Sequence, residues 1–333
     1  MKLPFLPHSS ALAAVLLLAG CATAPKPQAQ PAAPVPPPPP AAPPTPEHLP
    51  EQDDSRRTAW QAPPEIFPPG TPLVTRIVEI ARREHAAWSN PFIDANGRLA
   101  SRRIAEAERS HLADGVPAWE RVVAYWRDSG TLQRVFGSYT SAYQCQDPLA
   151  SSYTRSDCRS FIVDAPWSAA FISYVMVKAG ASGFRHSASH IDYIRAAYRG
   201  NGPYSFADPN QTPVALGDML CYVRNNRNVV GFGGLSAFLA SSNGGLQSHC
   251  DIVVNITANE VWLIGGNVAN MVTMRKLRRD GQGRAILPRP ISNDWVASDE
   301  DGQSPACSPE NEAACSMNRQ NWAALLKLKP EVQ

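Results

Sequence analysis

The sequence lacks several features that would each indicate a function at once. It has seven cysteines but no Cys-x-x-Cys pair, so a thiolate zinc site is disfavoured. Lys and Arg total 31 against 29 for Asp and Glu, with no basic stripe, which argues against nucleic acid as a partner. Beyond the N-terminal segment, no apolar run reaches the roughly 20 residues that a transmembrane helix needs. We therefore predict no nucleic acid, no metal ion and no cofactor.

The first twenty residues have the layout of an export signal. Lys2 is a short positive segment, and the apolar stretch 11–18 is too short to span a bilayer. Leu18-Ala19-Gly20-Cys21 resembles a bacterial lipobox, in which the cysteine is acylated after cleavage. Ala22, rather than Asp, follows and favours the outer membrane. We expect a signal peptide over 1–20, lipidation of Cys21 and a membrane-anchored protein facing the periplasm. The alternative is an ordinary secretory signal.

Residues 21–71 are rich in proline and alanine, including the run Pro36 to Pro40. Such a segment buries too little apolar surface to offset its chain entropy, so we expect a disordered or polyproline-like tether. At about 3.1 Å per residue, roughly fifty residues reach on the order of 150 Å. This length would carry a globular domain, residues 72–333, from a membrane to the peptidoglycan layer.

Six cysteines remain after Cys21, and an even number in an exported chain suggests disulfides. Fifteen pairings are open in principle. If each cysteine pairs with its neighbour along the sequence, the disulfides are Cys145–Cys158, Cys221–Cys250 and Cys307–Cys315.

Hydrophobic periodicity predicts an α+β domain, with helices followed by antiparallel strands. We expect helices over 72–88, after Pro117, over 166–179, over 187–198 with Ser187 as a cap, and near 322–326. We expect strands over 219–223, 249–256, 261–264 and 272–277, and loops over 137–163, 225–247 and 293–317. The 166–179 segment is apolar on nearly every face and should be buried all round.

Several stretches together resemble a bacterial family of unknown function, DUF2272, which is similar to the NlpC/P60 and CHAP-type cell-wall peptidases. The stretches span about 165–285 and are Pro166-Trp167-Ser168-Ala169-Ala170-Phe171, His190-Ile191-Asp192-Tyr193-Ile194, Gly217-Asp218-Met219-Leu220-Cys221-Tyr222-Val223-Arg224, Ser248-His249-Cys250-Asp251-Ile252-Val253-Val254 and Gly265-Gly266-Asn267-Val268. The resemblance implies a papain-like core, in which a buried helix packs on an antiparallel sheet, with a helical extension before it.

The resemblance also implies a site. Ser168 matches the position of the catalytic cysteine, His249 that of the base and Asn267 that of the residue that orients the base. A serine hydroxyl is far less acidic than a thiol, so the field of a helix N-terminus cannot ionise it. Serine needs a base that takes its proton during the attack, and the resulting imidazolium must then be stabilised by a negative charge. Asn267 is uncharged and cannot supply this stabilisation. Alternatively, Ser168 only satisfies N–H groups in the first helical turn.

Four further residues are candidates for the cleft: Trp167, His190, Asp218 and Asp251. Asp251 shares a strand face with His249, but about 6.6 Å along the strand, which is too far for a direct bond unless the strand bends. His186 and His190 have a metal-like spacing, yet a helix capped by Ser187 would not put them on one face.

Two functions remain open. The chain is either a serine variant of a cysteine peptidase that hydrolyses peptidoglycan peptide bonds, or an inactive module that binds peptidoglycan or a protein of the cell envelope.

Overall fold

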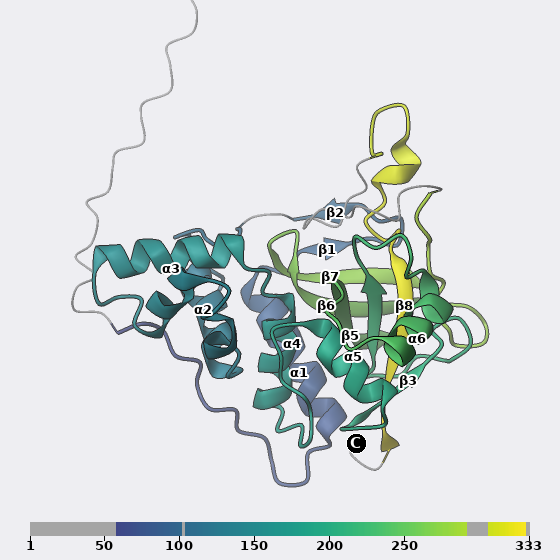
Figure 1. The fold of residues 1–333 in the computed structure, drawn as a ribbon, viewed down its shortest axis with the longest axis horizontal. Helices are drawn as coiled ribbons and strands as arrows, with labels where there is room; N and C mark the ends of the chain where they lie inside the picture. The colour runs from purple at the N-terminus through teal and green to yellow at the C-terminus, as the bar shows by residue number, and fades with distance from the viewer. Residues whose placement is uncertain (1–57, 102–103, 292–305, 331–333) are drawn as a thin grey trace, which may run out of the picture. The chain divides into compact units, whose positions relative to one another are not determined.

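The computed structural model describes residues 58–101, 104–291 and 306–330 (Figure 1). The expected signal peptide, Cys21 and the tether up to residue 57 lie outside these residues. Trp60, which we assigned to the tether, contacts the domain: its backbone N–H donates to Glu120 at 2.9 Å, and Arg121 lies 4.0 Å from its ring. Ordered contacts therefore begin upstream of residue 72.

The chain forms an α+β domain, as predicted from the sequence. Its helices are α1 (Leu73–Ala87), α2 (Ala118–Asp128), α3 (Ser152–Asp164), α4 (Ser168–Lys178), α5 (His190–Tyr198) and α6 (Gly231–Ser241), with 3₁₀ turns η2 (Leu132–Val135), η3 (Thr140–Gln146) and η5 (Glu312–Cys315). Its strands are β1 (Phe92–Ile93), β2 (Leu99–Ala100), β3 (Tyr204–Ala207), β4 (Met219–Val223), β5 (Ser248–Ile256), β6 (Glu260–Val268), β7 (Met271–Arg278) and β8 (Asn321–Leu328).

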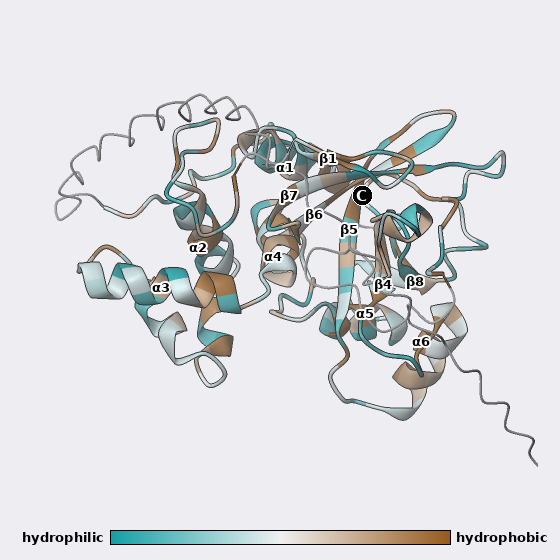
Figure 2. Cartoon of the chain, turned by 90° about the horizontal axis from the view of Figure 1, so that it is seen from above, coloured by the Kyte–Doolittle hydropathy of each residue, from teal (hydrophilic) through white to brown (hydrophobic). Residues whose placement is uncertain are grey.

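All eight strands belong to one sheet, in the order β2-β1-β7-β6-β5-β4-β8-β3. Neighbouring strands are antiparallel except β1 and β7, which run parallel. Helix α4 packs against β5 and β6 of the sheet and also contacts helices α1 and α2 (Figures 1 and 2). This position explains why α4 is apolar on nearly every face.

Alternation along β5 decides which side chains face α4. Cys250, Ile252 and Val254 belong to the large core shared with the helices, whereas Val253 belongs to the smaller cluster on the opposite face. Because side chains alternate with a period of two, His249 and Asp251 lie on the face of Val253, away from α4.

Four predictions of local structure were wrong. Helix α5 begins at His190, and its N-cap residue is Ser189 rather than the expected Ser187. The expected loop 137–163 contains η3 and α3, and α3 begins with a capping box between Ser151 and Thr154. The expected loop 225–247 contains α6. The expected closing helix near 322–326 is strand β8, which pairs with β3 and β4. Its residues are buried on both faces, and pairing inside the sheet overrides their helical spacing.

The three expected disulfides are all present: Cys145–Cys158, Cys221–Cys250 and Cys307–Cys315. Within the described residues no single helix is long and apolar enough to span a membrane, and only α3 and α4 together pass that test, as a pair bent by 102°.

Candidate active site

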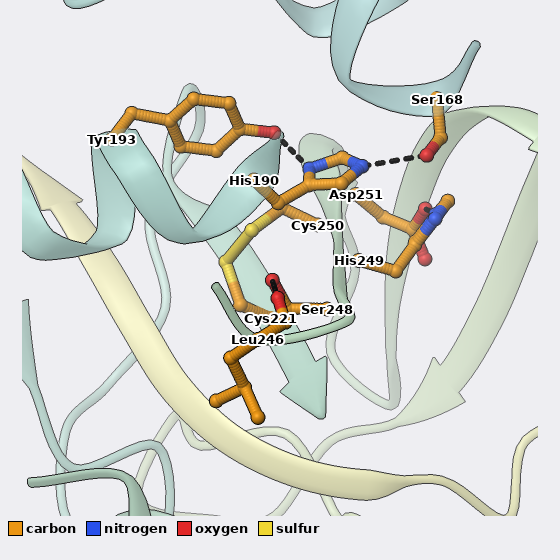
Figure 3. The surroundings of a disulfide bond; sticks show 9 residues. All are labelled: Ser168, His190, Tyr193, Cys221, Leu246, Ser248, His249, Cys250 and Asp251. Atoms are coloured by element: carbon orange, nitrogen blue, oxygen red, sulfur yellow. Dashed lines mark hydrogen bonds and ion pairs between the residues drawn. A yellow bond between two sulfur atoms is a disulfide. The ribbon is translucent and has the colours of Figure 1, made fainter. Parts of the chain in front are cut away.

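Ser168 is the first residue of α4, and its hydroxyl meets an imidazole. Its Oγ lies 2.7 Å from Nε2 of His190, the first residue of α5 (Figure 3). Both side chains are buried, with relative exposures of 6% and 3%. The partner of Ser168 is therefore His190 and not the expected His249. We had predicted His190 only as a possible residue of the cleft.

The other ring nitrogen of His190 meets a phenol. Nδ1 forms a hydrogen bond with the hydroxyl of Tyr193, one helical turn further along α5 (Figure 3). If Nδ1 carries the ring proton, it donates to Tyr193 and leaves Nε2 free to accept from Ser168. The three side chains then form a chain of hydrogen bonds that ends in a neutral group.

His249 belongs to a separate network on the far face of β5. Its Nε2 lies 2.8 Å from Asp251 Oδ1, and Asp251 Oδ2 accepts from Arg275 Nε at 3.2 Å. Arg224 Nη2 lies 3.4 Å from His249 Nδ1. An arginine can only donate, so Nδ1 accepts and the ring proton is on Nε2. Both nitrogens of His249 thus have partners other than Ser168.

The contact between His249 and Asp251 corrects the expectation that Asp251 is too far away. The two residues do share a strand face, but the imidazole extends along the strand and spans the gap. Gly265, on the neighbouring strand, makes the contact possible: a Cβ there would lie 1.8 Å from Asp251 Oδ1 and 3.0 Å from His249 Nε2. The missing side chain also leaves room for Arg275, on β7, to reach Asp251 across β6.

Burial favours the neutral form of both histidines. Burial, with the neighbouring His249 and Arg224, lowers the pKa of His190 well below 6.5. Burial also lowers the pKa of His249, although Asp251 opposes this shift. For Asp251, burial works to raise the pKa, but His249 and Arg275 more than offset it and the pKa is lowered. The ring centroids of His190 and His249 lie 5.0 Å apart, so protonating one disfavours protonating the other.

Asn267 does not orient His249. It lies near the end of β6, where the pairing with β7 is irregular, and it has a positive φ of 54°. Its side-chain oxygen is buried and has no hydrogen-bond partner within the described residues. The role that we expected of Asn267 toward His249 is filled by Asp251.

Two other cleft candidates lie elsewhere. Trp167 is fully buried and stacks on Trp88 and Tyr125, with ring centroids 5.8 and 5.6 Å away. Asp218 is also buried and accepts from Lys327 Nζ at 2.6 Å and from the Leu328 N–H at 3.0 Å. It therefore fixes β8 beside β4 and takes no part in the site. In residues 58–101, 104–291 and 306–330, no cluster of three or more His, Cys, Asp or Glu side chains could hold a metal.

Tyr193 and Arg224 were not predicted to have a role, although both lie within the motifs that resemble the family. The signal for Tyr193 was its spacing of three residues from His190, which places two helical side chains side by side. Arg224 directly follows β4, where a strand end approaches a cleft. Arg275 carried no comparable signal, because its contact depends on a gap across β6.

A cavity of about 420 Å³ opens beside the serine and the imidazole. Ser168 and His190 line it together with Arg224 and the segment 246–248 that leads into β5. The Cys221–Cys250 disulfide joins β4 to β5 next to this wall (Figure 3). Within the domain, α4, α5 and β5 thus each bring one part of the site to the same cavity.

The fold and the site define a class: an α+β domain with a buried serine–histidine pair at a cavity. Residues 113–328 match the model of a family described as "Uncharacterized protein conserved in bacteria (DUF2272)", and the chain belongs to that family. No curated protein and no solved structure matches the chain.

Proposed function

We propose that this protein is a hydrolase of acyl bonds that uses Ser168 as its nucleophile and His190 as its general base. The observation that carries this proposal is the 2.7 Å contact between Ser168 Oγ and His190 Nε2 at the wall of a cavity. A nucleophile and a base within hydrogen-bonding reach are the minimum that such chemistry requires.

In the first step, Ser168 Oγ attacks a carbonyl carbon while its proton passes to His190 Nε2. The developing oxyanion is stabilised by N–H groups at the start of α4, where no side chain caps the helix. The bond to the leaving group then breaks, and His190 returns the proton to that group. Water, activated by the same imidazole, hydrolyses the acyl-serine and restores the free hydroxyl.

We further propose that the fold is papain-like and that the substrate is a peptide bond of peptidoglycan. The position of Ser168 at the start of a buried helix that packs on β5 and β6 supports the first part. The expected lipid on Cys21 and the expected tether support the second, because together they would hold the domain in the bacterial envelope at the outer membrane, facing the periplasm.

The experiment is digestion of purified muropeptides by the domain 58–333, with new termini identified by mass spectrometry. We expect cleavage that Ser168→Ala and His190→Gln abolish. Ser236→Ala, on α6, is the control and should cleave like the unmodified protein. Cleavage that persists in Ser168→Ala would contradict this mechanism.

A second candidate function is binding of peptidoglycan or an envelope protein without turnover. One observation favours it: His190 is backed by the neutral phenol of Tyr193 and not by a carboxylate, so an imidazolium at this position is poorly stabilised. Under this alternative, purified sacculi retain the domain without forming product, and Ser168→Ala leaves the retention unchanged.

A further inference from the structure

Among the described residues that line the cavity, Arg224 is the one side chain with a permanent charge. Apart from His190, it is the only ionisable side chain among the residues that line the cavity. Burial and the nearby Arg224 both favour neutral His190. The described wall of the cavity beside the nucleophile is therefore cationic, and none of its residues in that part of the chain brings a carboxylate that would oppose an anionic group.

The guanidinium of Arg224 is fixed but not neutralised. Its Nη2 donates to Tyr222 Oη at 3.1 Å and approaches His249 Nδ1 at 3.4 Å. Neither partner is a carboxylate. Nε is buried and has no hydrogen-bond partner within the described residues, and no Asp or Glu of that part of the chain pairs with this arginine. The carboxylate of Asp251, on the same face of β5, is already held by His249 and Arg275.

We infer that the cavity binds an acyl substrate with a free carboxylate close to the scissile bond, and that Arg224 binds this carboxylate. The inference rests on the proposed function. A guanidinium has a planar set of donors that matches a carboxylate, and such charge-assisted bonds are stronger than neutral ones. A single positive charge balances one carboxylate, whereas a phosphate dianion would leave a surplus negative charge in a partly buried site.

The binding test uses the Ser168→Ala protein, which cannot turn over substrate. Two small probe compounds are titrated into this protein, and their binding is measured by NMR. The probes are N-acetylalanine, which has a free carboxylate, and its uncharged amide. We expect the acid to bind at least about tenfold more tightly than the amide. In the Ser168→Ala protein, the further substitution Arg224→Gln should remove the preference for the acid over the amide. Arg224→Lys in its place should keep part of that preference. Arg227→Gln removes the same charge from an exposed position three residues away and should keep the preference.

The ring signals of His190 give a second readout. A bound carboxylate offsets the positive charge of Arg224, so the pKa of His190 should rise when N-acetylalanine binds and should not change with the amide. Equal binding of acid and amide would overturn the inference, as would tighter binding of inorganic phosphate than of N-acetylalanine. A clear preference for the acid, combined with no muropeptide cleavage by the unmodified protein, would contradict the hydrolase proposal while supporting carboxylate recognition.

Discussion

Ser168 and His190 form a hydrogen bond between two neutral groups, and this determines how the pair responds to pH. As a base, His190 must be unprotonated, and its pKa is lowered well below 6.5 by burial first and then by His249 and Arg224. We expect kcat/KM to rise with pH, with a midpoint below 6.5, and to stay level from there to pH 8. The measurement is a pH profile of muropeptide cleavage. A midpoint above 7 would show that another group controls the reaction.

Tyr193 is a positioning residue that acts through His190. Its hydroxyl fixes the imidazole orientation and accepts from Nδ1 in the productive tautomer. Tyr193→Phe removes this acceptor, and we expect kcat to fall by about tenfold to a hundredfold, a part of what general-base catalysis contributes. NMR of ¹⁵N-labelled histidine should show a mixture of His190 tautomers in this variant. Tyr198→Phe, on the exposed side of the same helix, is the matched control and should change neither the rate nor the spectrum.

The buried histidines also link stability to pH. His190 and His249 both have a lower pKa in the folded protein than their ordinary 6.5, chiefly through burial. The unfolded chain therefore binds more protons as the pH drops through about 6.5, and the free energy of unfolding falls with it. We expect lower stability at pH 5.5 than at pH 7.5 in urea titrations. His190→Gln should reduce this dependence but not remove it, because the pKa of His249, His85 and His186 is lowered as well.

At the scale of elements, strand β6 is shaped by two glycines. A side chain at Gly265 would collide with Asp251, and one at Gly266 would lie 2.4 Å from Phe171 Cβ on α4. Because Gly265 has no side chain, the His249–Asp251–Arg275 network can form on one face of the sheet. Because Gly266 has none, helix α4 can pack closely against the other face of the sheet. Their consecutive positions follow from the alternation of faces along a strand.

We expect Gly265→Ala to destabilise the domain by about 1–3 kcal/mol, because the new methyl group must push Asp251 or His249 aside. Urea unfolding measures the loss. Gly281→Ala is the control, since a Cβ there meets no atom within 4 Å, and its free energy of unfolding should change by less than about 0.5 kcal/mol. Equal effects of the two substitutions would show that the network tolerates a side chain at residue 265.

Several elements could be predicted from the sequence because their patterns are local. Helix α1 was predicted from the apolar spacing of residues 72–88, and helix α4 from the apolar character of residues 166–179 on nearly every face. Short apolar runs predicted the strands β4, β5, β6 and β7. Strand β8 was missed because the spacing of Trp322, Leu325 and Leu326 also fits a helix. Only pairing with β3 and β4 decides between the two.

At the scale of the whole molecule, the three disulfides differ in the length of chain that they enclose. Cys221–Cys250 spans 29 residues and is fully buried beside the site, whereas Cys307–Cys315 spans 8 residues and is half-buried. Closing the longer loop removes more entropy from the unfolded chain. The Cys221–Cys250 disulfide therefore restrains both the unfolded ensemble and the wall of the cavity.

Replacing Cys221 and Cys250 with alanine should cost about 3–4 kcal/mol, and replacing Cys307 and Cys315 about 2–3 kcal/mol. Urea unfolding under non-reducing conditions compares the two double variants with the unmodified protein. The Cys221/Cys250 variant should also lose muropeptide cleavage, because Arg224 directly follows β4 and the segment 246–248 leads into β5, and both line the cavity. The opposite order of stabilities would show that loop closure is not the main contribution of these bonds.

The amino-acid sequence by itself determined the helices with a clear period, the central strands and the family to which the chain belongs. These depend on spacing and on residue type, which act over a few residues. The partner of Ser168 was decided only by tertiary structure. The apolar residues Cys250, Ile252 and Val254 turn toward α4, so alternation sends His249 to the opposite face, where Asp251 and Arg224 occupy its ring. The packing of α5 then brings His190 to the hydroxyl.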